Sequence, residues 1–309
     1  SAPEMFWLAA RFDRPDWAAW QRGHVGSASP LDLIYAADHA ATDSDSASPP
    51  LDRWFENVQV GTMRSAWDDP DAWFVGIKGG DNSASHGHLD LGSFVFDLHG
   101  RRWAVDIGSD DYNLPAYFGA RRWTYYRLRA ESHNTLLVAP GEAPDQAPSA
   151  VAHIERFIST PGEARAVLDL TQAYPAASSV RRGIALLDGR SRLLIQDEIE
   201  CSEDHDPTPI RWAIHTPAVV ALDDDGRGAT LTLGEDSVRL RVIEPAGARL
   251  GVAPAGPLPS SPNPPGQGAN SGITRIEFWT ESRRAVRIVV EFTGGDGRPA
   301  RPLVPLSDW

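Results

Sequence analysis

The hydrophobic pattern divides the chain into two regions of different periodicity. In residues 1–49 the apolar side chains recur at intervals near 3.6, which is the repeat of an amphipathic helix. From residue 50 onward, short runs of β-branched and aromatic residues alternate with turn residues, as in antiparallel strands. The pattern predicts one or two helices in residues 1–49 and a mainly β region in residues 50–309. The polar stretch Ser44–Pro50 is the predicted link between them.

The β region contains pairs of predicted strands that flank short turns. The predicted turns are His99–Gly100, Asp188–Arg190, Gly234–Asp236 and Glu281–Arg283. At least ten strands in serial hairpins favour an antiparallel β-sandwich over alternating β-α-β units. The Pro-, Gly- and Ser-rich stretch Pro254–Gly272 predicts a long exposed loop.

Length, charge and cysteine content narrow the class of protein. The chain has 309 residues, enough for one large domain or two ordinary ones. Its net charge of −13 argues against a nucleic-acid partner, although arginines gathered in a cleft could still bind an anionic sugar polymer. No run approaches the roughly 20 apolar residues of a membrane helix, so no membrane partner is expected. The single cysteine, Cys201, excludes an internal disulfide.

The segment Gly79–Val138 concentrates the side chains that carry chemistry. It holds His86 and His88 in an H-x-H motif, Asp106 after an apolar run, and His133 before an asparagine. Two histidines and an aspartate are a suitable zinc set with a fourth position left open. If the H-x-H motif is extended, both rings face the same side, so one is free for acid–base work beside the metal. Each part alone is also typical of a turn, cap or packing residue, and the pattern leaves both readings open.

The order of the motifs nevertheless resembles one family, the heparinase II/III-like C-terminal region of polysaccharide lyases. The resemblance covers roughly residues 50–240. It rests on Met63–Trp67, Lys78–Gly79, His86–Phe94, Asp106–Gly108, Tyr112 and His133–Thr135. It implies a Zn²⁺ ion bound by His88, Asp106 and His133, with His86 lining the active site.

The resemblance also implies a function and a partner. Lyases of this type cleave uronate-containing anionic polysaccharides or oligosaccharides by β-elimination, between this sandwich and an N-terminal (α/α) toroid. Residues 1–49 have room for only the last one or two toroid helices, so the expected partner is a toroid domain, on this protein's own chain or on a separate one. A non-catalytic carbohydrate-binding or assembly module and a zinc hydrolase are the alternative functions. We expect a periplasmic or secreted location.

The remaining site residues follow from the same comparison and from side-chain chemistry. We predict His86 and Tyr125 as catalytic, and Tyr112, Arg121, Arg122 and Asn134 as substrate-binding. Arginine is suited to this role because its guanidinium can grip a carboxylate or sulfate through two hydrogen bonds. The alternative for the aromatic residues is that they only pack the loop. His215, on a predicted strand, is expected to be a packing residue or to support the site from behind.

Overall fold

A computed structural model describes residues 2–27, 29–36, 49–141, 144–201, 207–295 and 302–309. The chain forms two compact units, Ser1–Pro50 and Leu51–Trp309. Most of the predicted link at Ser44–Pro50 lies outside the described residues. No helix in the described ranges is long and apolar enough to cross a membrane.

The first unit contains three helices: α1 (Glu4–Arg11), α2 (Pro15–His24) and α3 (Pro30–Ala36). The predicted number of one or two was therefore wrong. Pro15 and Pro30 each begin a new helix, because proline fits the first turn of a helix but disrupts its interior. The unit has a small core of its own, made by Phe6, Ala9 and Ala18.

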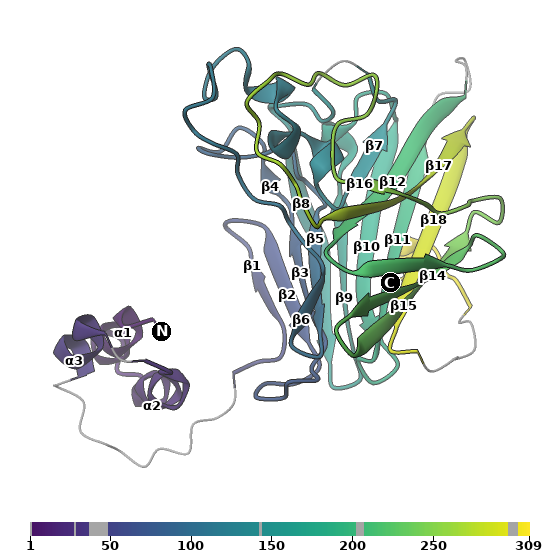
Figure 1. Ribbon diagram of the computed structural model, residues 1–309. Coiled ribbons are helices and arrows are strands. Elements are labelled where there is room, and N and C mark those ends of the chain that lie inside the picture. Colours follow the sequence, from purple (N-terminus) through teal and green to yellow (C-terminus); the bar gives the residue numbers. More distant parts are fainter. Residues whose placement is uncertain (1, 28, 37–48, 142–143, 202–206, 296–301) are drawn as a thin grey trace. The chain divides into compact units, whose positions relative to one another are not determined.

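The second unit is built from three antiparallel sheets, so the predicted mainly β fold is confirmed (Figure 1). The five-stranded sheet has the order β1 (Arg53–Phe55), β2 (Val60–Arg64), β3 (Phe74–Lys78), β5 (Phe94–Leu98), β6 (Arg101–Ala104). The four-stranded sheet has the order β16 (Gly251–Pro254), β17 (Thr274–Ser282), β12 (Thr208–Thr216), β7 (Leu136–Val138). The nine-stranded sheet has the order β13 (Val219–Leu222), β14 (Gly228–Leu233), β15 (Asp236–Glu244), β18 (Ala285–Thr293), β11 (Arg192–Glu200), β10 (Ser179–Leu187), β9 (Glu163–Asp169), β8 (Val151–Thr160), β4 (Gly80–Asp81).

Three of the four predicted hairpins form, and the fourth does not. Strand pairs β5–β6, β10–β11 and β14–β15 are antiparallel neighbours. At the first turn His99 and Gly100 both have positive φ, 55° and 64°, as a tight two-residue hairpin requires. β17 and β18 belong to different sheets: β17 pairs with β12 and β16, and β18 pairs with β11 and β15. The turn after β17 is therefore a connection between layers.

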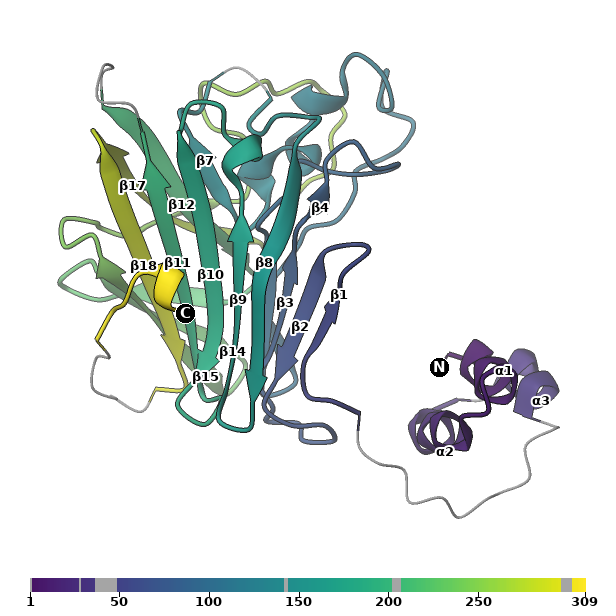
Figure 2. The same ribbon diagram turned by 180° about the vertical axis from the view of Figure 1, so that it is seen from behind.

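One hydrophobic core joins the three sheets. It includes Phe96 from the five-stranded sheet, Trp212 and Phe278 from the four-stranded sheet, and Ile184 and Ile195 from the nine-stranded sheet. The backbone N–H of Val105, just after β6, donates to the carbonyl of His215 on β12 at 2.9 Å. This bond joins the chain just after β6, the edge strand of the five-stranded sheet, to β12 of the four-stranded sheet. The nine-stranded sheet packs against both (Figures 1 and 2). The seam between the smaller sheets is where the candidate site lies.

The predicted long loop at Pro254–Gly272 is present between β16 and β17. It is held against an earlier stretch of the chain. The side chain of Gln267 accepts a hydrogen bond from the backbone N–H of Tyr126 at 2.6 Å, and the Ser261 hydroxyl donates to Glu131 at 2.7 Å. The loop thereby supports residues 109–131, which connect β6 to the site.

Candidate active site

Three potential metal ligands meet at the seam of the two smaller sheets. His88 and Asp90 lie on the loop between β4 and β5, and His133 follows the 3-10 turn Ala130–Ser132. Each offers one ligand atom, and these atoms lie within 4.8 Å of one another. The rings of His88 and His133 are 5.3 Å apart between centroids. The sequence predicted both histidines for one site, and the structure brings them together.

The two aspartates occupy different positions around this group. Asp106 Oδ2 lies 2.8 Å from Nδ1 of His133, and its Oδ1 accepts the backbone N–H of Gly108 at 2.7 Å. Asp90, which the sequence analysis did not single out, is the carboxylate grouped with the two histidines. It also forms an ion pair with Lys78 at 2.5 Å. The signal that could have found Asp90 is its position two residues after His88.

Burial and charge set the protonation of the group. Burial, with a further contribution from the neighbouring His133, lowers the pKa of His88 to about 4. Burial alone would lower the pKa of His133 and raise that of Asp106. Their mutual attraction and hydrogen bond outweigh burial, so the pKa of His133 is raised and that of Asp106 is lowered. His88 is thus a neutral ring with a lone pair at neutral pH, and Asp106 is a carboxylate.

These residues fit a bound cation. Nε2 of His133 is buried and has no hydrogen-bond partner among the described residues. Buried polar atoms in proteins are rarely left without a partner, so a bound cation would account for this one. Imidazole nitrogens and carboxylate oxygens are the donor set that zinc takes in proteins. Four such groups converge here from three segments of the chain: the loop between β4 and β5, the residues after β6 and the turn before β7.

His86 does not lie on an extended segment, so the reasoning that placed it on the face of His88 was wrong. Residues 85 and 86 form a turn, and His86 has a φ of 62°, in the left-handed region. Its ring is exposed and contacts Tyr112 and Phe118, with centroids 5.7 and 5.2 Å away. Tyr112 is itself 50% exposed. The turn therefore presents His86 to solvent beside an accessible phenol.

The other site residues predicted on this segment differ in accessibility. Tyr125 is fully buried, and its hydroxyl donates to the Pro115 carbonyl at 2.6 Å, which argues against the predicted proton-transfer role. Arg122 donates to the carbonyls of Gly87 and Tyr117 at 2.5 and 3.2 Å. It therefore ties residues 112–126, the aromatic segment, to the loop that carries His86 and His88. Arg121 is exposed.

A family comparison shows which known proteins this domain resembles. The sequence profile of the family described as heparinase II/III-like, C-terminal, matches residues 49–265. The chain belongs to this family. No curated protein sequence matches it.

Solved structures share the fold of this heparinase II/III-like domain. One heparinase III is 15% identical, with a TM-score of 0.65, over 93% of this chain and 42% of its own. The heparan sulfate lyase HepC from Pedobacter heparinus is 15% identical, with a TM-score of 0.65, over 96% of this chain and 43% of its own. The heparinase II/III-like chain thus spans less than half the length of the lyases it resembles.

Asn134 has a positional role that sequence reasoning missed. It was predicted to contact substrate, but its side chain is fully buried in this heparinase II/III-like domain. Its Nδ2 donates to the carbonyls of Phe94 and Val105 at 2.8 and 2.9 Å, and its Oδ1 accepts the backbone N–H of His215 at 2.7 Å. These bonds fasten the seam beside Asp106 and His133. His215 is buried as expected, and its Nε2 lies 2.9 Å from the Tyr126 hydroxyl.

Proposed function

We propose that this chain is the β-sandwich part of a polysaccharide lyase that cleaves uronate-containing anionic polysaccharide by β-elimination, with a toroid domain completing the active site. The observation that carries the proposal is the meeting of His88, His133 and two carboxylates, on a loop that also carries the exposed His86 against Tyr112. Membership of the heparinase II/III-like family supports the assignment.

The reaction needs three things from the protein. A base takes the proton on C5 of the uronate, an acid protonates the oxygen that leaves C4, and positive charge or donors stabilise the enolate-like species beside the carboxylate. In this chain His86 is suited to the base or to the neutralising donor. Tyr112 is the phenol within reach of the same surface. A toroid domain would supply the opposite wall of the cleft and further proton-transfer groups.

We infer that zinc is held by His88, Asp106 and His133. Asp106 is preferred because the family resemblance implies a ligand at that position and its Oδ2 lies 2.8 Å from His133. Asp90, which is grouped with the two histidines and paired with Lys78, is the alternative carboxylate. A zinc ion there would supply positive charge near the substrate carboxylate and hold the seam in one arrangement.

Zinc content should distinguish the two carboxylates. Elemental analysis should find about one equivalent in the unaltered protein and little in H88A. D106N should lose most of the metal, whereas D90N should retain it. Retention by D106N with loss in D90N would instead make Asp90 the ligand and Asp106 the residue that orients His133. Full retention by H88A would remove the metal assignment altogether.

The two candidate phenols can be separated by matched substitutions. With the toroid present, Y112F should lower kcat at least about tenfold, because its hydroxyl is accessible beside His86. Y125F should leave kcat within about twofold, since the Tyr125 hydroxyl is already committed to Pro115. The kcat of each variant is measured on a polymer that the unaltered enzyme cleaves. The reverse pattern would restore Tyr125 as the proton-transfer residue.

The proposed function is tested by the ultraviolet absorbance of unsaturated uronate products. The chain is mixed with heparin, heparan sulfate, hyaluronan, chondroitin or alginate, with and without a toroid half. A rise in absorbance with the toroid supports a lyase. Saturated products would instead indicate a hydrolase.

A second candidate is a non-catalytic carbohydrate-binding or assembly module. It is favoured by the exposed rings of Tyr112 and Phe118, which lie against each other and could pack on the faces of sugar rings. Binding of an anionic polysaccharide without product formation, even with a toroid half supplied, would support this candidate over the lyase.

A further inference from the structure

We propose that Asp110 is a positioning residue of the active site, which holds Tyr112 against His86. It does so by anchoring the stretch of chain before Tyr112 to the long loop Pro254–Gly272. The inference rests on the proposed function, in which Tyr112 and His86 serve proton transfer. Asp110 is only 8% exposed, although aspartate is usually a surface residue. A buried carboxylate needs hydrogen-bond donors, and its donors show which segments it holds together.

The carboxylate of Asp110 accepts hydrogen bonds from two backbone N–H groups. Its Oδ1 accepts the N–H of Gly268 at 2.9 Å and that of Asp111 at 2.8 Å. Its Oδ2 lies 3.2 Å from the same Gly268 nitrogen. Gly268 belongs to the long loop, so this one side chain joins two segments that are 158 positions apart in the sequence.

Arg127 fastens the same two segments with a separate set of bonds. Its Nη1 donates to the carbonyl of Ser109, and its Nε donates to the side-chain oxygen of Asn270, each at 2.9 Å. A Cβ at Gly268 would lie 3.2 Å from both Arg127 Nη2 and Asp110 Oδ1. Glycine at this position therefore leaves the room in which both side chains reach the loop.

The anchored stretch is connected to Tyr112 through a buried ring. The backbone N–H of Asp110 donates to the hydroxyl of Tyr117 at 3.2 Å, and Tyr117 is only 2% exposed. The ring centroids of Tyr117 and Tyr112 are 5.2 Å apart, and Tyr112 in turn contacts His86. Because Tyr112 is half exposed, the core around it fixes it less than a buried ring. Its position depends on the chain two residues before it and on Tyr117, and Asp110 holds both.

This arrangement bears on turnover because proton transfer depends on geometry. A general acid or base must lie within hydrogen-bond reach of the atom it serves, and a small misplacement of a catalytic group costs rate. Asp110 is too deeply buried to act on a substrate itself. Its contribution to the rate therefore passes through the position of Tyr112.

The position of Tyr112 can be followed without any substrate. The chain has six tyrosines, so labelling with 3-fluorotyrosine gives a readable fluorine NMR spectrum, in which Y112F identifies the Tyr112 signal. D110A and G268V should each shift or broaden this signal, because each opens the connection to the loop. D110N should leave it nearly unchanged, since the amide oxygen still accepts the Gly268 N–H. An unmoved Tyr112 signal in folded D110A and G268V would overturn the proposal.

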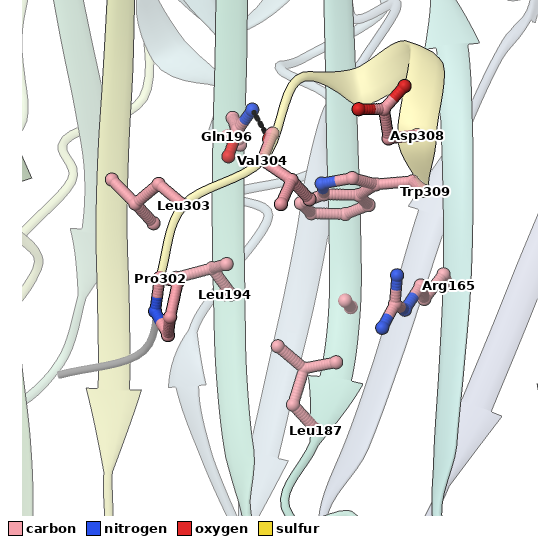
Figure 3. Close-up of a pocket in the computed structure, with 10 residues that line it drawn as sticks. Arg165, Leu187, Leu194, Gln196, Pro302, Leu303, Val304, Asp308 and Trp309 are labelled. Atoms are coloured by element: carbon pink, nitrogen blue, oxygen red, sulfur yellow. Dashed lines mark hydrogen bonds between the residues drawn. The ribbon is translucent and has the colours of Figure 1, made fainter. Parts of the chain in front are cut away.

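Two controls separate positioning from a general loss of stability. S261A breaks the bond to Glu131 in another part of the same loop. W309A removes a buried ring from the outer face of the nine-stranded sheet (Figure 3), and it should lower the unfolding midpoint. Neither should move the Tyr112 signal. A shift in W309A as large as that in D110A would mean that the signal reports stability, and it would refute the proposal.

Kinetics then show whether Asp110 acts through Tyr112. With the toroid present, D110A should lower kcat at least about fivefold in the otherwise unaltered chain. In the Y112F background D110A should lower kcat less than about twofold, because the hydroxyl that it positions is already gone. Equal losses in the two backgrounds would contradict positioning through Tyr112. If the unaltered chain with the toroid forms no unsaturated product from any polymer, the proposed function fails, and the fluorine spectra decide whether Asp110 positions Tyr112.

Discussion

Replacing Asp197 with alanine should destabilise the β unit by about 3–5 kcal/mol, because it leaves a buried arginine charge without its partner. Asp197 and Arg182 are both fully buried and form a two-bond ion pair, at 2.7 and 2.9 Å. Arg182 also donates to the carbonyls of Gly92 and Asn134 at 2.8 and 3.0 Å. The pair therefore fastens the nine-stranded sheet to the loops that carry the site. Denaturant unfolding measures the loss.

Two controls make this result specific. R181A removes the neighbouring charge on the same strand, whose partner Glu155 is 2.7 Å away at the surface, and should change stability by less than about 1 kcal/mol. The double variant R182M/D197L removes both charges and should be less destabilised than D197A alone, since no unpaired charge remains. A loss below about 1 kcal/mol in D197A would show that Arg182 is satisfied without the carboxylate.

H86A should lower kcat/KM at least about a hundredfold when the toroid half is supplied, the low end for an acid–base group. The ring is exposed and lies against Tyr112, so it can reach a substrate on that surface. It is outside the group of His88, Asp90 and His133, so the zinc content should stay close to that of the unaltered protein.

The backbone of His86 calls for a second variant. At a φ of 62°, alanine adds strain that asparagine tolerates better, so H86N removes the imidazole with less disturbance of the turn. H86N and H86A should lose activity equally. H99A, at the exposed β5–β6 turn, is the matched histidine control and should retain full activity. Near-normal turnover in H86N would leave His86 as a packing residue of the aromatic segment, and loss of zinc would make it a ligand.

Local patterns in the sequence were enough to predict the strands and most of the hairpins. Alternating apolar residues around His99–Gly100 and Asp188–Arg190 specify both strand and turn, because side-chain period and positive-φ turn residues are properties of neighbouring residues. The same local pattern could not predict that β17 and β18 lie in different sheets. β17 pairs with β12 and β18 pairs with β11, and both partners are distant in sequence from the turn that joins β17 to β18. The residues around that turn therefore do not reveal the pairing.

For the site, the sequence by itself predicted that His88, Asp106 and His133 gather, through the order of motifs along one chain. Only the tertiary structure placed Asp90 among them, turned His86 onto a left-handed bend, and buried Tyr125 and Asn134. The physical reason is that residue type limits what a side chain can do, whereas its accessibility and partners are set by segments far away in the sequence. Asn134 illustrates this: its three side-chain bonds reach Phe94, Val105 and His215, and no local pattern could reveal them.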